Sequence, residues 1–418
     1  MADTTPTKTS ISQRAAAIRP SSTLAVTERF KALRAAGEDV LGFAAGEPDF
    51  PTPPRVIEAA KRALDAGMTR YTPSIGDPAT RQAIADKLTA ENGIGGLSGK
   101  HTAVSVGGKH SLYNIFQALI DPGDEVILPT PAWVSYAPQI SLAGGTIWEL
   151  PTTVESAFKI TPEALREAIT PRSRVLVMNS PSNPCGTMYS PDELRELADV
   201  VAEAAASIAP RLVIVTDEIY GKIIFGEHPH LSMGSIDSVA DRVVTCNGLS
   251  KAYSMTGWRV GYCAAPGEFG LELISAIGRL QSQMTSNIPS FILPAIRTAL
   301  TECDAEVEAM RSAFAQRAVL IERRLREIPG LSFPSPEGAF YVFVDVSSHF
   351  GTTSPAGTTI DSALLFAGAL LDEAKVAVVP GEDFGGCGPS CIRMSFACDE
   401  DQINAGVDRL AAFVGSLR

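Results

Sequence analysis

The sequence predicts an α/β protein with two packed domains, the larger of which contains a mostly parallel sheet. Three observations support this prediction. The 418 residues exceed the size at which a single hydrophobic core stops growing. Short β-branched runs alternate with longer stretches of helical periodicity, which is typical of βα units. From about residue 301 this alternation gives way to a long amphipathic segment and a few isolated strands.

The first of these two parts contains seven apolar runs with the length and composition of strands. Between them lie three stretches with apolar side chains at helical spacing, at residues 111–120, 191–206 and 271–280. The alternation predicts a large domain over residues 55–300 with a sheet of seven strands. The expected strands are residues 102–106, 125–128, 146–150, 174–178, 212–216, 242–246 and 259–264.

The second part predicts a smaller α+β domain over residues 301–418. It begins with a charged amphipathic helix at 305–328, and the strand-like segments that follow are FPSPEGAFYVFVDV, VAVVPG and CIRMSFA. Residues 1–54 are rich in Pro, Ser and Thr and include one helical stretch at 24–36. We expect this N-terminal segment to join the small domain or to reach a partner chain.

The composition limits the partners and the cellular location. A formal net charge of -12 gives no indication of the basic surface that binding to nucleic acids or anionic membranes requires. The N-terminal residues MADTTPTKTS contain no apolar signal segment, and no run of 18 uninterrupted apolar residues occurs. We therefore expect a cytoplasmic protein that binds neither nucleic acid nor a membrane.

The seven cysteines are odd in number and scattered, which fits a reducing compartment rather than a disulfide framework. Only Cys387 and Cys391 lie close together, in GGCGPSC, and no Cys or His at zinc-like spacing accompanies them. We expect these two cysteines to be free thiols, and we expect no metal site.

Polar side chains follow three of the predicted strands. Asp217 follows the apolar run of RLVIVTDEIY, Asn183 lies in the loop of VLVMNSPSNPCGT, and Lys251 follows VVTCNGLS. Ligands of parallel sheets bind beyond the carboxyl ends of the strands, so these side chains mark a candidate site. Taken alone, Lys251 is either a solvated surface group or a desolvated nucleophilic amine. Asp217 is either a ligand of a bound group or the N-cap of a helix.

Gly107 and Gly108 separate a predicted strand from a predicted helix in SVGGKHSLYNIF. Backbone N–H groups at such a helix start can bind a phosphate, although a glycine turn without any ligand explains the pair equally well. The glycines lack the remaining positions of GxGxxG, so a nicotinamide dehydrogenase is poorly supported.

Residues 248–261, GLSKAYSMTGWRVG, resemble in full the lysine segment of class I aminotransferases, which depend on pyridoxal 5′-phosphate (PLP). Other motifs of that family occur in the same order along nearly the whole chain: AAGEPDFPTP, TRYTP, SVGGKHSLYN, PAWVSY, NSPSNPCGT, DEIY, then EGAFY and RMSFA. The resemblance implies a fold-type I PLP-dependent transferase. It also implies a homodimer whose active sites include residues of both chains.

Carried over residue by residue, the resemblance assigns roles around the cofactor ring. Lys251 is the lysine that holds PLP as a Schiff base and then moves the proton between substrate and cofactor. Asp217 pairs with the pyridinium nitrogen, which keeps PLP an electron sink. Tyr220 and Asn183 hydrogen-bond the phenolic oxygen, and Trp133 stacks on the ring.

The resemblance also implies how phosphate and substrate are bound. Tyr71 reaches the phosphate of the neighbouring subunit. Arg393 binds the substrate α-carboxylate through its planar guanidinium, and the backbone of Gly46 approaches the same carboxylate. The remaining groups around the phosphate are Gly107, Gly108, Lys109, Ser250 and Arg259.

Two departures from the family pattern narrow the comparison. Gly248 stands where some members have a serine, so the phosphate site must differ slightly from theirs. The arginine with which animal-type aspartate aminotransferases bind the distal carboxylate has no match. The chain instead resembles a bacterial subgroup in which Lys109, Arg19 and Thr23 are associated with the distal carboxylate of aspartate or prephenate.

From the residues and the resemblance we expect an aminotransferase that exchanges amino groups between aspartate or glutamate and a 2-oxo acid. The acceptors are oxaloacetate, 2-oxoglutarate and possibly prephenate. The main alternative is a PLP-dependent aromatic or neutral amino-acid aminotransferase or C–S lyase of the same fold. A PLP-binding sensor that has no catalytic activity is a remote alternative.

Overall fold

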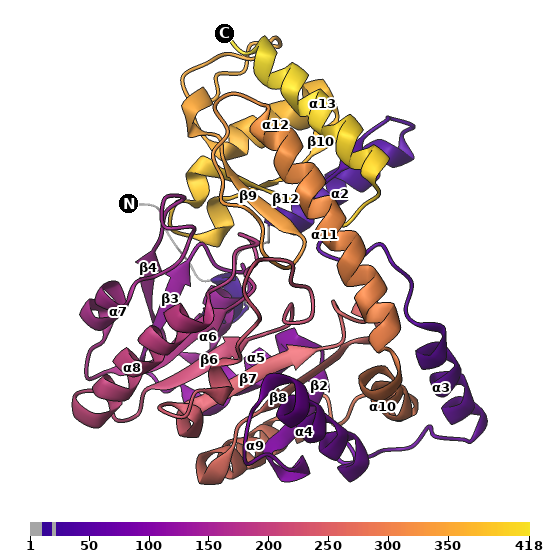
Figure 1. Cartoon of the computed structure of the whole chain (residues 1–418), viewed down its shortest axis with the longest axis vertical. Helices are drawn as coiled ribbons and strands as arrows, with labels where there is room; N and C mark the ends of the chain where they lie inside the picture. Colours follow the sequence, from indigo (N-terminus) through magenta and orange to yellow (C-terminus); the bar gives the residue numbers. More distant parts are fainter. Residues whose placement is uncertain (1–10, 19–21) are drawn as a thin grey trace.

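The computed structural model describes residues 11–18 and 22–418. A large domain with a seven-stranded sheet lies beneath a smaller domain with a three-stranded antiparallel sheet (Figure 1). No helix within the described ranges is long and apolar enough to span a bilayer. The predicted α/β architecture, with its larger and smaller domains, is confirmed.

The large sheet has the strand order β2-β8-β7-β6-β5-β3-β4. All neighbours run parallel except β8, which is antiparallel to both β2 and β7. Each of the seven expected runs overlaps one of these strands, with ends that differ by at most two residues, so the prediction of a mostly parallel seven-stranded sheet is confirmed. The bounds are β2 Thr102–Val106, β3 Glu125–Thr130, β4 Thr146–Pro151, β5 Ser173–Asn179, β6 Val213–Asp217, β7 Val243–Gly248 and β8 Val260–Ala264.

Helices cover both faces of this sheet because its central strands alternate apolar side chains between two buried layers. On β5, Val175 and Val177 pack with α5, α6 and α9, whereas Leu176 and Met178 pack with α7 and α8. A third cluster joins α3, α4 and α10 to β2 and β8. The helices are α3 Pro54–Asp65, α4 Pro78–Asn92, α5 Gly108–Leu119, α6 Tyr136–Ala143, α7 Pro162–Ala168, α8 Pro191–Ser207, α9 Gly267–Ser282 and α10 Leu293–Glu302.

Local sequence explains where several helices begin. Before α8, the Ser190 hydroxyl accepts from the Glu193 N–H, and the Glu193 carboxylate accepts from the Ser190 N–H. Asp77 caps α4, and Asp399 caps the last helix. These caps satisfy backbone N–H groups that would otherwise lack a partner.

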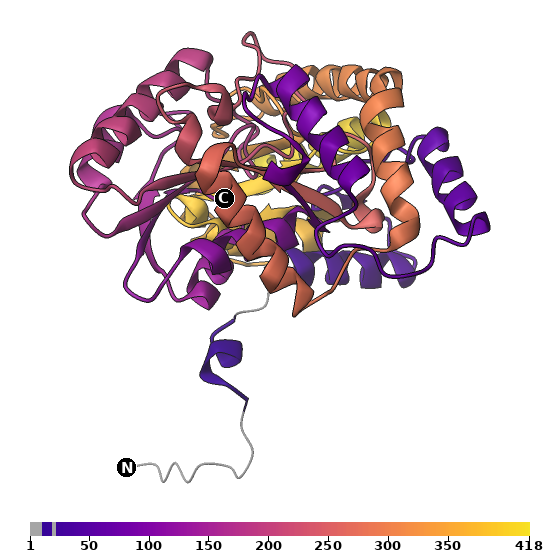
Figure 2. The same cartoon turned by 90° about the horizontal axis from the view of Figure 1, so that it is seen from below.

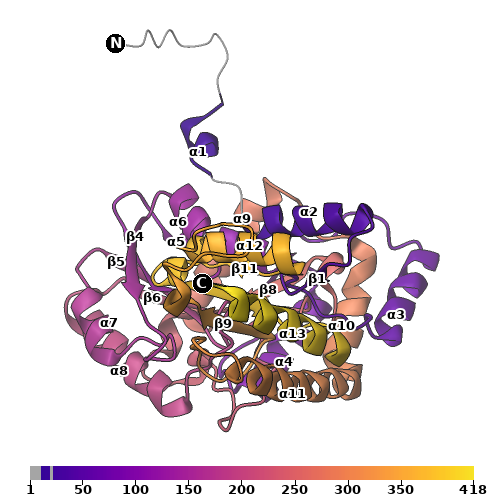
Figure 3. The ribbon, with the colours of Figure 1, turned by 90° about the horizontal axis from the view of Figure 1, so that it is seen from above.

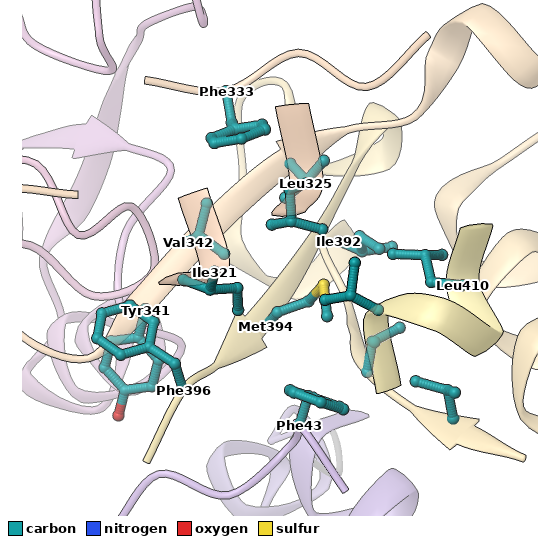
Figure 4. Packing of buried hydrophobic residues seen from close by; sticks show 14 of the residues in the cluster. Phe43, Ile321, Leu325, Phe333, Tyr341, Val342, Ile392, Met394, Phe396 and Leu410 are labelled. Carbon is teal, nitrogen blue, oxygen red and sulfur yellow. The ribbon is translucent and has the colours of Figure 1, made fainter. Parts of the chain in front are cut away.

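The small domain contains β11-β12-β9 with α11, α12 and α13 packed around them. Its core includes Ile321 and Leu325 of α11, Val342 of β9 and Leu410 of α13 (Figure 4). The long helix predicted at 305–328 is confirmed as α11. The bounds are α11 Asp304–Arg326, β9 Tyr341–Asp345, α12 Ala363–Ala374, β11 Val379–Pro380, β12 Cys391–Ser395 and α13 Glu400–Ser416.

The N-terminal segment lies against the small domain. Helix α2 (Ser22–Ala35) leads to β1 (Leu41–Gly42), which pairs in parallel with β10 (Val376–Ala377). Phe43 follows β1 and packs into the small-domain core (Figure 4). The short helix α1 (Gln13–Ala16) has no buried residue and stands away from the rest of the chain (Figures 2 and 3).

Candidate active site

The carboxyl ends of three adjacent parallel strands form the base of the candidate site. Asn179 at the end of β5 is paired with Asp217 at the end of β6, and Asp217 is paired with Cys246 of β7. The loop after β5 carries Asn183, and the turn after β7 carries Lys251. The structure thus gathers the three predicted polar side chains at one edge of the sheet.

Asp217 is a buried carboxylate that is held in place from several directions. Its side chain accepts hydrogen bonds from the Tyr136 hydroxyl at 2.9 Å and from the Ile219 N–H at 3.2 Å. Asn179 donates to the Asp217 carbonyl oxygen at 2.8 Å. Burial raises the pKa of Asp217 to about 6, so a cation beside it would be favourable. No α-helix begins after Asp217, so the helix-cap interpretation is wrong.

Lys251 does not behave as a solvated surface lysine. Its Nζ donates to the carbonyl oxygen of Gly46 and lies 5.9 Å from the ring of Tyr220 and 5.6 Å from that of Phe340. Burial, followed by the charge of Arg393, lowers the pKa of Lys251 to about 8. A lysine amine with a lowered pKa is a better nucleophile at neutral pH.

Arg393 on β12 enters the same site from the small domain. It is 3% exposed and donates to Asn183 Oδ1 at 3.0 Å and to the Ala44 carbonyl oxygen at 3.1 Å. Its Nε is buried and has no hydrogen-bond partner, and none of the ion pairs among the described residues includes Arg393. A buried guanidinium with unused donors is costly unless an anion such as a carboxylate binds it.

A cluster of cationic and backbone donors lies beside Lys251. Helix α5 begins at Gly108, and Gly107 before it has a φ of 84°, which favours glycine. The guanidinium of Arg259 lies against Gly107 where a Cβ would overlap it. Burial lowers the pKa of Lys109, and the charge of Arg259 lowers it further. The positive end of α5 and these cations together suit a phosphate.

Trp133 contacts Lys109 of this cationic cluster and also Tyr136, the tyrosine that donates to Asp217. The Lys109 Nζ lies 5.1 Å from the centre of the Trp133 ring. The Trp133 ring also meets Tyr136 edge-on, with centroids 5.3 Å apart and an interplanar angle of 82°.

Two residues of the lysine segment are fixed by burial and packing. Ser250, adjacent to Lys251, is 8% exposed. Gly248 is required by packing, because a Cβ there would lie 2.7 Å from the carbonyl oxygen of Val260.

Three of the predicted site residues remain outside this group. Tyr71 is 90% exposed. Arg19 lies outside the described residues, and Thr23 falls within the backbone of α2. All seven cysteines are free, and no group of three or more metal-ligating side chains occurs in the part of the chain that is described.

Sequence reasoning missed three residues that hold the site together. Tyr136 and Asn179 orient Asp217, and Tyr341 lies under the guanidinium of Arg393 with 4.6 Å from ring centroid to Cζ. Tyr136 and Tyr341 occur in the motifs PAWVSY and EGAFY, so the signal was present. Their contacts were hidden because each joins segments far apart in the chain.

Comparison with known proteins decides the family. Residues 38–410 match the family model described as aminotransferase class I and II. The chain belongs to this family. The aminotransferase is 43% identical over 406 residues to an aspartate aminotransferase of Geobacillus stearothermophilus, covering 97% of this chain and 98% of that protein. It is also 43% identical to an aspartate/prephenate aminotransferase of Cereibacter sphaeroides, covering 97% and 99%.

A solved structure shares the fold of the aminotransferase. The crystal structure of the aspartate aminotransferase from Rhizobium meliloti superposes with a TM-score of 0.91. It is 36% identical in sequence, and the match covers 98% of this chain and all of that one (100%). The predicted fold-type I PLP-dependent transferase fold is confirmed.

The aminotransferase depends on PLP, as its family does, and its own residues fit the parts of that cofactor. The cations around Gly107 suit the phosphate. The buried carboxylate of Asp217 suits a protonated ring nitrogen, because a positive partner offsets the cost of burying the charge. Lys251 supplies an amine with a lowered pKa for the aldehyde.

Proposed function

We propose that the enzyme transfers amino groups between aspartate or glutamate and a 2-oxo acid such as oxaloacetate or 2-oxoglutarate. The observation that carries the proposal is the buried, unpaired guanidinium of Arg393, with an orphaned Nε, near the desolvated Lys251. This arrangement offers a binding site for a carboxylate close enough to the nucleophilic amine of Lys251 for the charge of Arg393 to lower the pKa of that amine. The names of the relatives support dicarboxylic substrates.

In this proposal the large domain orients the cofactor through residues at its strand ends. Asp217, held by Tyr136, pairs with the pyridine nitrogen and keeps it protonated. Bound PLP then withdraws electrons from the substrate Cα, which is the chemistry that the protein itself lacks. Tyr220 and Asn183 bind the phenolic oxygen, and Trp133 covers the ring. The phosphate is held by Gly107, Gly108, Lys109, Ser250 and Arg259.

Lys251 has two tasks in this proposal. Its Nζ would hold the cofactor covalently, and with substrate in the site the same atom would move a proton to and from the substrate Cα. A pKa of about 8 suits both tasks near neutral pH, because the free amine is accessible without extreme conditions. The Gly46 carbonyl oxygen, which accepts from Nζ, helps to keep the amine within the site.

Arg393 orients the substrate. Asn183 and Ala44 each use one of its N–H groups, which leaves Nε and further donors for the α-carboxylate. The backbone of Gly46 approaches the same carboxylate. Holding the substrate by this group fixes the Cα relative to Lys251, which lowers the entropic cost of proton transfer.

We further propose that Lys109, Arg19 and Thr23 receive the distal carboxylate of aspartate or prephenate. The Lys109 ammonium lies over the ring of Trp133, which is proposed to cover the cofactor. Prephenate is a possible acceptor because one of the close relatives carries it in its name.

The active enzyme in this proposal is a cytoplasmic homodimer with shared active sites. The exposed ring of Tyr71 and the exposed helix α1 are surfaces that a second chain can cover. Tyr71 reaches the phosphate in the site of the partner subunit. We retain the division into an N-terminal segment (1–54), a large domain (55–300) and a small domain (301–418).

A substrate panel tests the proposal. Aspartate, glutamate, a neutral and an aromatic amino acid are offered as donors to oxaloacetate, 2-oxoglutarate and prephenate, and cystathionine is added as a lyase substrate. We expect aspartate and glutamate to give the highest kcat/KM. Loss of activity with aspartate, or turnover of cystathionine, would favour the neutral or aromatic aminotransferase or the C–S lyase instead. No turnover in any assay would favour the sensor.

Arg19→Ala tests the distal-carboxylate site separately. A charge-assisted contact contributes about 1.5–3 kcal/mol, so kcat/KM for aspartate and prephenate should fall by about ten- to a hundredfold. Donors without a distal carboxylate serve as the control and should change little. Unchanged prephenate amination in this variant would contradict the assignment of Arg19, whereas Lys109→Ala can affect every substrate through the phosphate.

A further inference from the structure

Tyr341 contacts both the substrate-binding arginine and the tyrosine proposed to bind the cofactor. Its ring lies 4.6 Å from Cζ of Arg393, and its hydroxyl oxygen lies 3.1 Å from the hydroxyl oxygen of Tyr220. The two tyrosine rings meet edge-on, with centroids 5.8 Å apart. Both tyrosines are at most 2% exposed, so water does not replace either contact.

Tyr341 belongs to the small-domain core but directs its polar end out of it. The ring lies at one end of the apolar cluster, and the hydroxyl points away from the other labelled side chains (Figure 4). Strand pairing explains the contact with the arginine. Ser395 is opposite Tyr341 in the ladder of β9 and β12, so Arg393 is its diagonal neighbour on the same face.

The position of Tyr341 is fixed by the loop that carries Asn183. The N–H groups of Glu337 and Gly338 both donate to the Gly186 carbonyl oxygen, at 2.8 and 3.0 Å. The Glu337 carboxylate accepts from the Met188 N–H at 3.0 Å. These bonds hold the start of β9 against the large-domain loop, and the Ala339 N–H, which donates to the Ile223 carbonyl oxygen at 2.9 Å, holds it beside the segment that carries Tyr220.

The charge of Arg393 acts on both hydroxyls of the pair, and most strongly on Tyr341. Burial raises the pKa of both tyrosines, but the charge of Arg393 lowers the pKa of Tyr341 as its next largest influence, whereas Tyr341 raises that of Tyr220 further. Either hydroxyl of the pair can donate, but if Tyr220 uses its only proton on the cofactor, as proposed above, Tyr341 must be the donor. When it donates to Tyr220, the proton of Tyr220 is free to point at another acceptor, and the second hydrogen bond is strengthened.

We propose that Tyr341 is a positioning residue that couples the occupancy of Arg393 to the hydroxyl of Tyr220. The proposal rests on the proposed roles of those two residues. With Arg393 free, its charge polarises Tyr341, and Tyr220 donates strongly to the phenolic oxygen of the cofactor. A carboxylate on Arg393 cancels that charge and weakens the donation. Binding of substrate at one end of the site thereby adjusts the basicity of the Lys251 linkage at the other.

The visible absorbance of the holoenzyme provides a readout other than turnover. The negative charge on the phenolic oxygen helps the nitrogen of the Lys251 linkage to keep its proton. A hydrogen bond to that oxygen disperses the charge, so a weaker hydrogen bond should raise the pH at which the linkage loses its proton. This pH is the midpoint of the absorbance titration. Tyr341→Phe keeps the ring and removes only the hydroxyl. A neutral hydrogen bond is worth about 0.5–1.5 kcal/mol, so the midpoint should rise by about 0.4 to 1 pH unit.

A double-mutant cycle separates coupling from simple packing. If Tyr341 acts through Tyr220, Tyr341→Phe should raise the midpoint in the wild-type background and have almost no further effect in the Tyr220→Phe background. A merely structural role would leave the two effects additive. Tyr262→Phe is the matched control, since this tyrosine is equally buried in the large domain and should leave the midpoint unchanged.

Titration with and without succinate, a dicarboxylate without an amino group, tests the link to Arg393. Succinate should raise the midpoint in the wild type, and Tyr341→Phe should reduce that rise by at least half. An additive cycle, or an unchanged succinate response in Tyr341→Phe, would refute the coupling and leave the proposed function intact. Absence of a visible band from Lys251 in the wild type would overturn both.

Discussion

Replacing Lys251 by methionine should make the cofactor-free protein more stable near neutral pH. The structure places the ammonium among Tyr220, Phe340 and the Arg393 charge, and this environment lowers the pKa from 10.5 to about 8. A difference of that size corresponds to about 3.4 kcal/mol of folding free energy. Part of the side chain stays accessible to solvent, so screening reduces the effect, and we expect about 2 kcal/mol.

The sign follows from the proton balance of the two states. Because the pKa of Lys251 is lower in the folded state, the unfolded chain binds more protons between about pH 8 and 10.5. Wild-type stability therefore gains over this window as pH rises. The advantage of Lys251→Met should be complete below pH 8 and should shrink towards zero as the pH approaches 10.5.

The assay is urea unfolding of the cofactor-free wild type and variant at pH 7 and pH 10, at one protein concentration. Lys87→Met is the matched control, because Lys87 is also buried but pairs with Glu91 at 3.0 Å, and its loss should destabilise the protein. If Lys251→Met were less stable than the wild type at pH 7, or equally shifted at both pH values, the reasoning about Lys251 would be wrong.

Three further substitutions test the rest of the site. Asp217→Ala should still bind PLP but lose turnover by about a hundredfold or more, because an unprotonated ring nitrogen is a poor electron sink; near-normal kcat would contradict this role. Arg393→Lys should lower kcat/KM for aspartate by about ten- to a hundredfold, since an ammonium lacks the planar fork, and an unchanged value would refute carboxylate binding there. Gly186→Ala should lower Tm by several degrees, because φ is +73° and the new Cβ would overlap the Tyr341 carbonyl oxygen; an unaltered melting curve would show that the loop can move.

The sequence was sufficient to predict the large sheet because its central strands are buried on both faces. Residues such as Val175 and Leu176 form continuous apolar runs separated by helical periodicity, and each run overlaps one strand. Lys251, Asp217 and Asn183 were predictable for a related reason. Asp217 ends its strand and the other two lie in the loops just after theirs, and the parallel order of those strands brings their ends together.

The contacts around Tyr341 and Tyr136 were not predictable from local patterns. Both residues are almost fully buried. What distinguishes them is the partner of one hydroxyl, Tyr220 in one case and Asp217 in the other. Such partners are set by how two distant segments dock, and periodicity carries no information about that.

The pairing of β1 with β10 affects the order in which the protein can fold during synthesis. β1 leaves the ribosome early, but its partner β10 follows the entire seven-stranded sheet. The large domain can therefore reach its native packing while the first segment still lacks its neighbours. Only when α12 and β10 have emerged can Phe43 enter the core of the small domain. The segment around β1 is thus synthesised early but packs late. The active site is completed only after β10 and β12, which carries Arg393, have been synthesised.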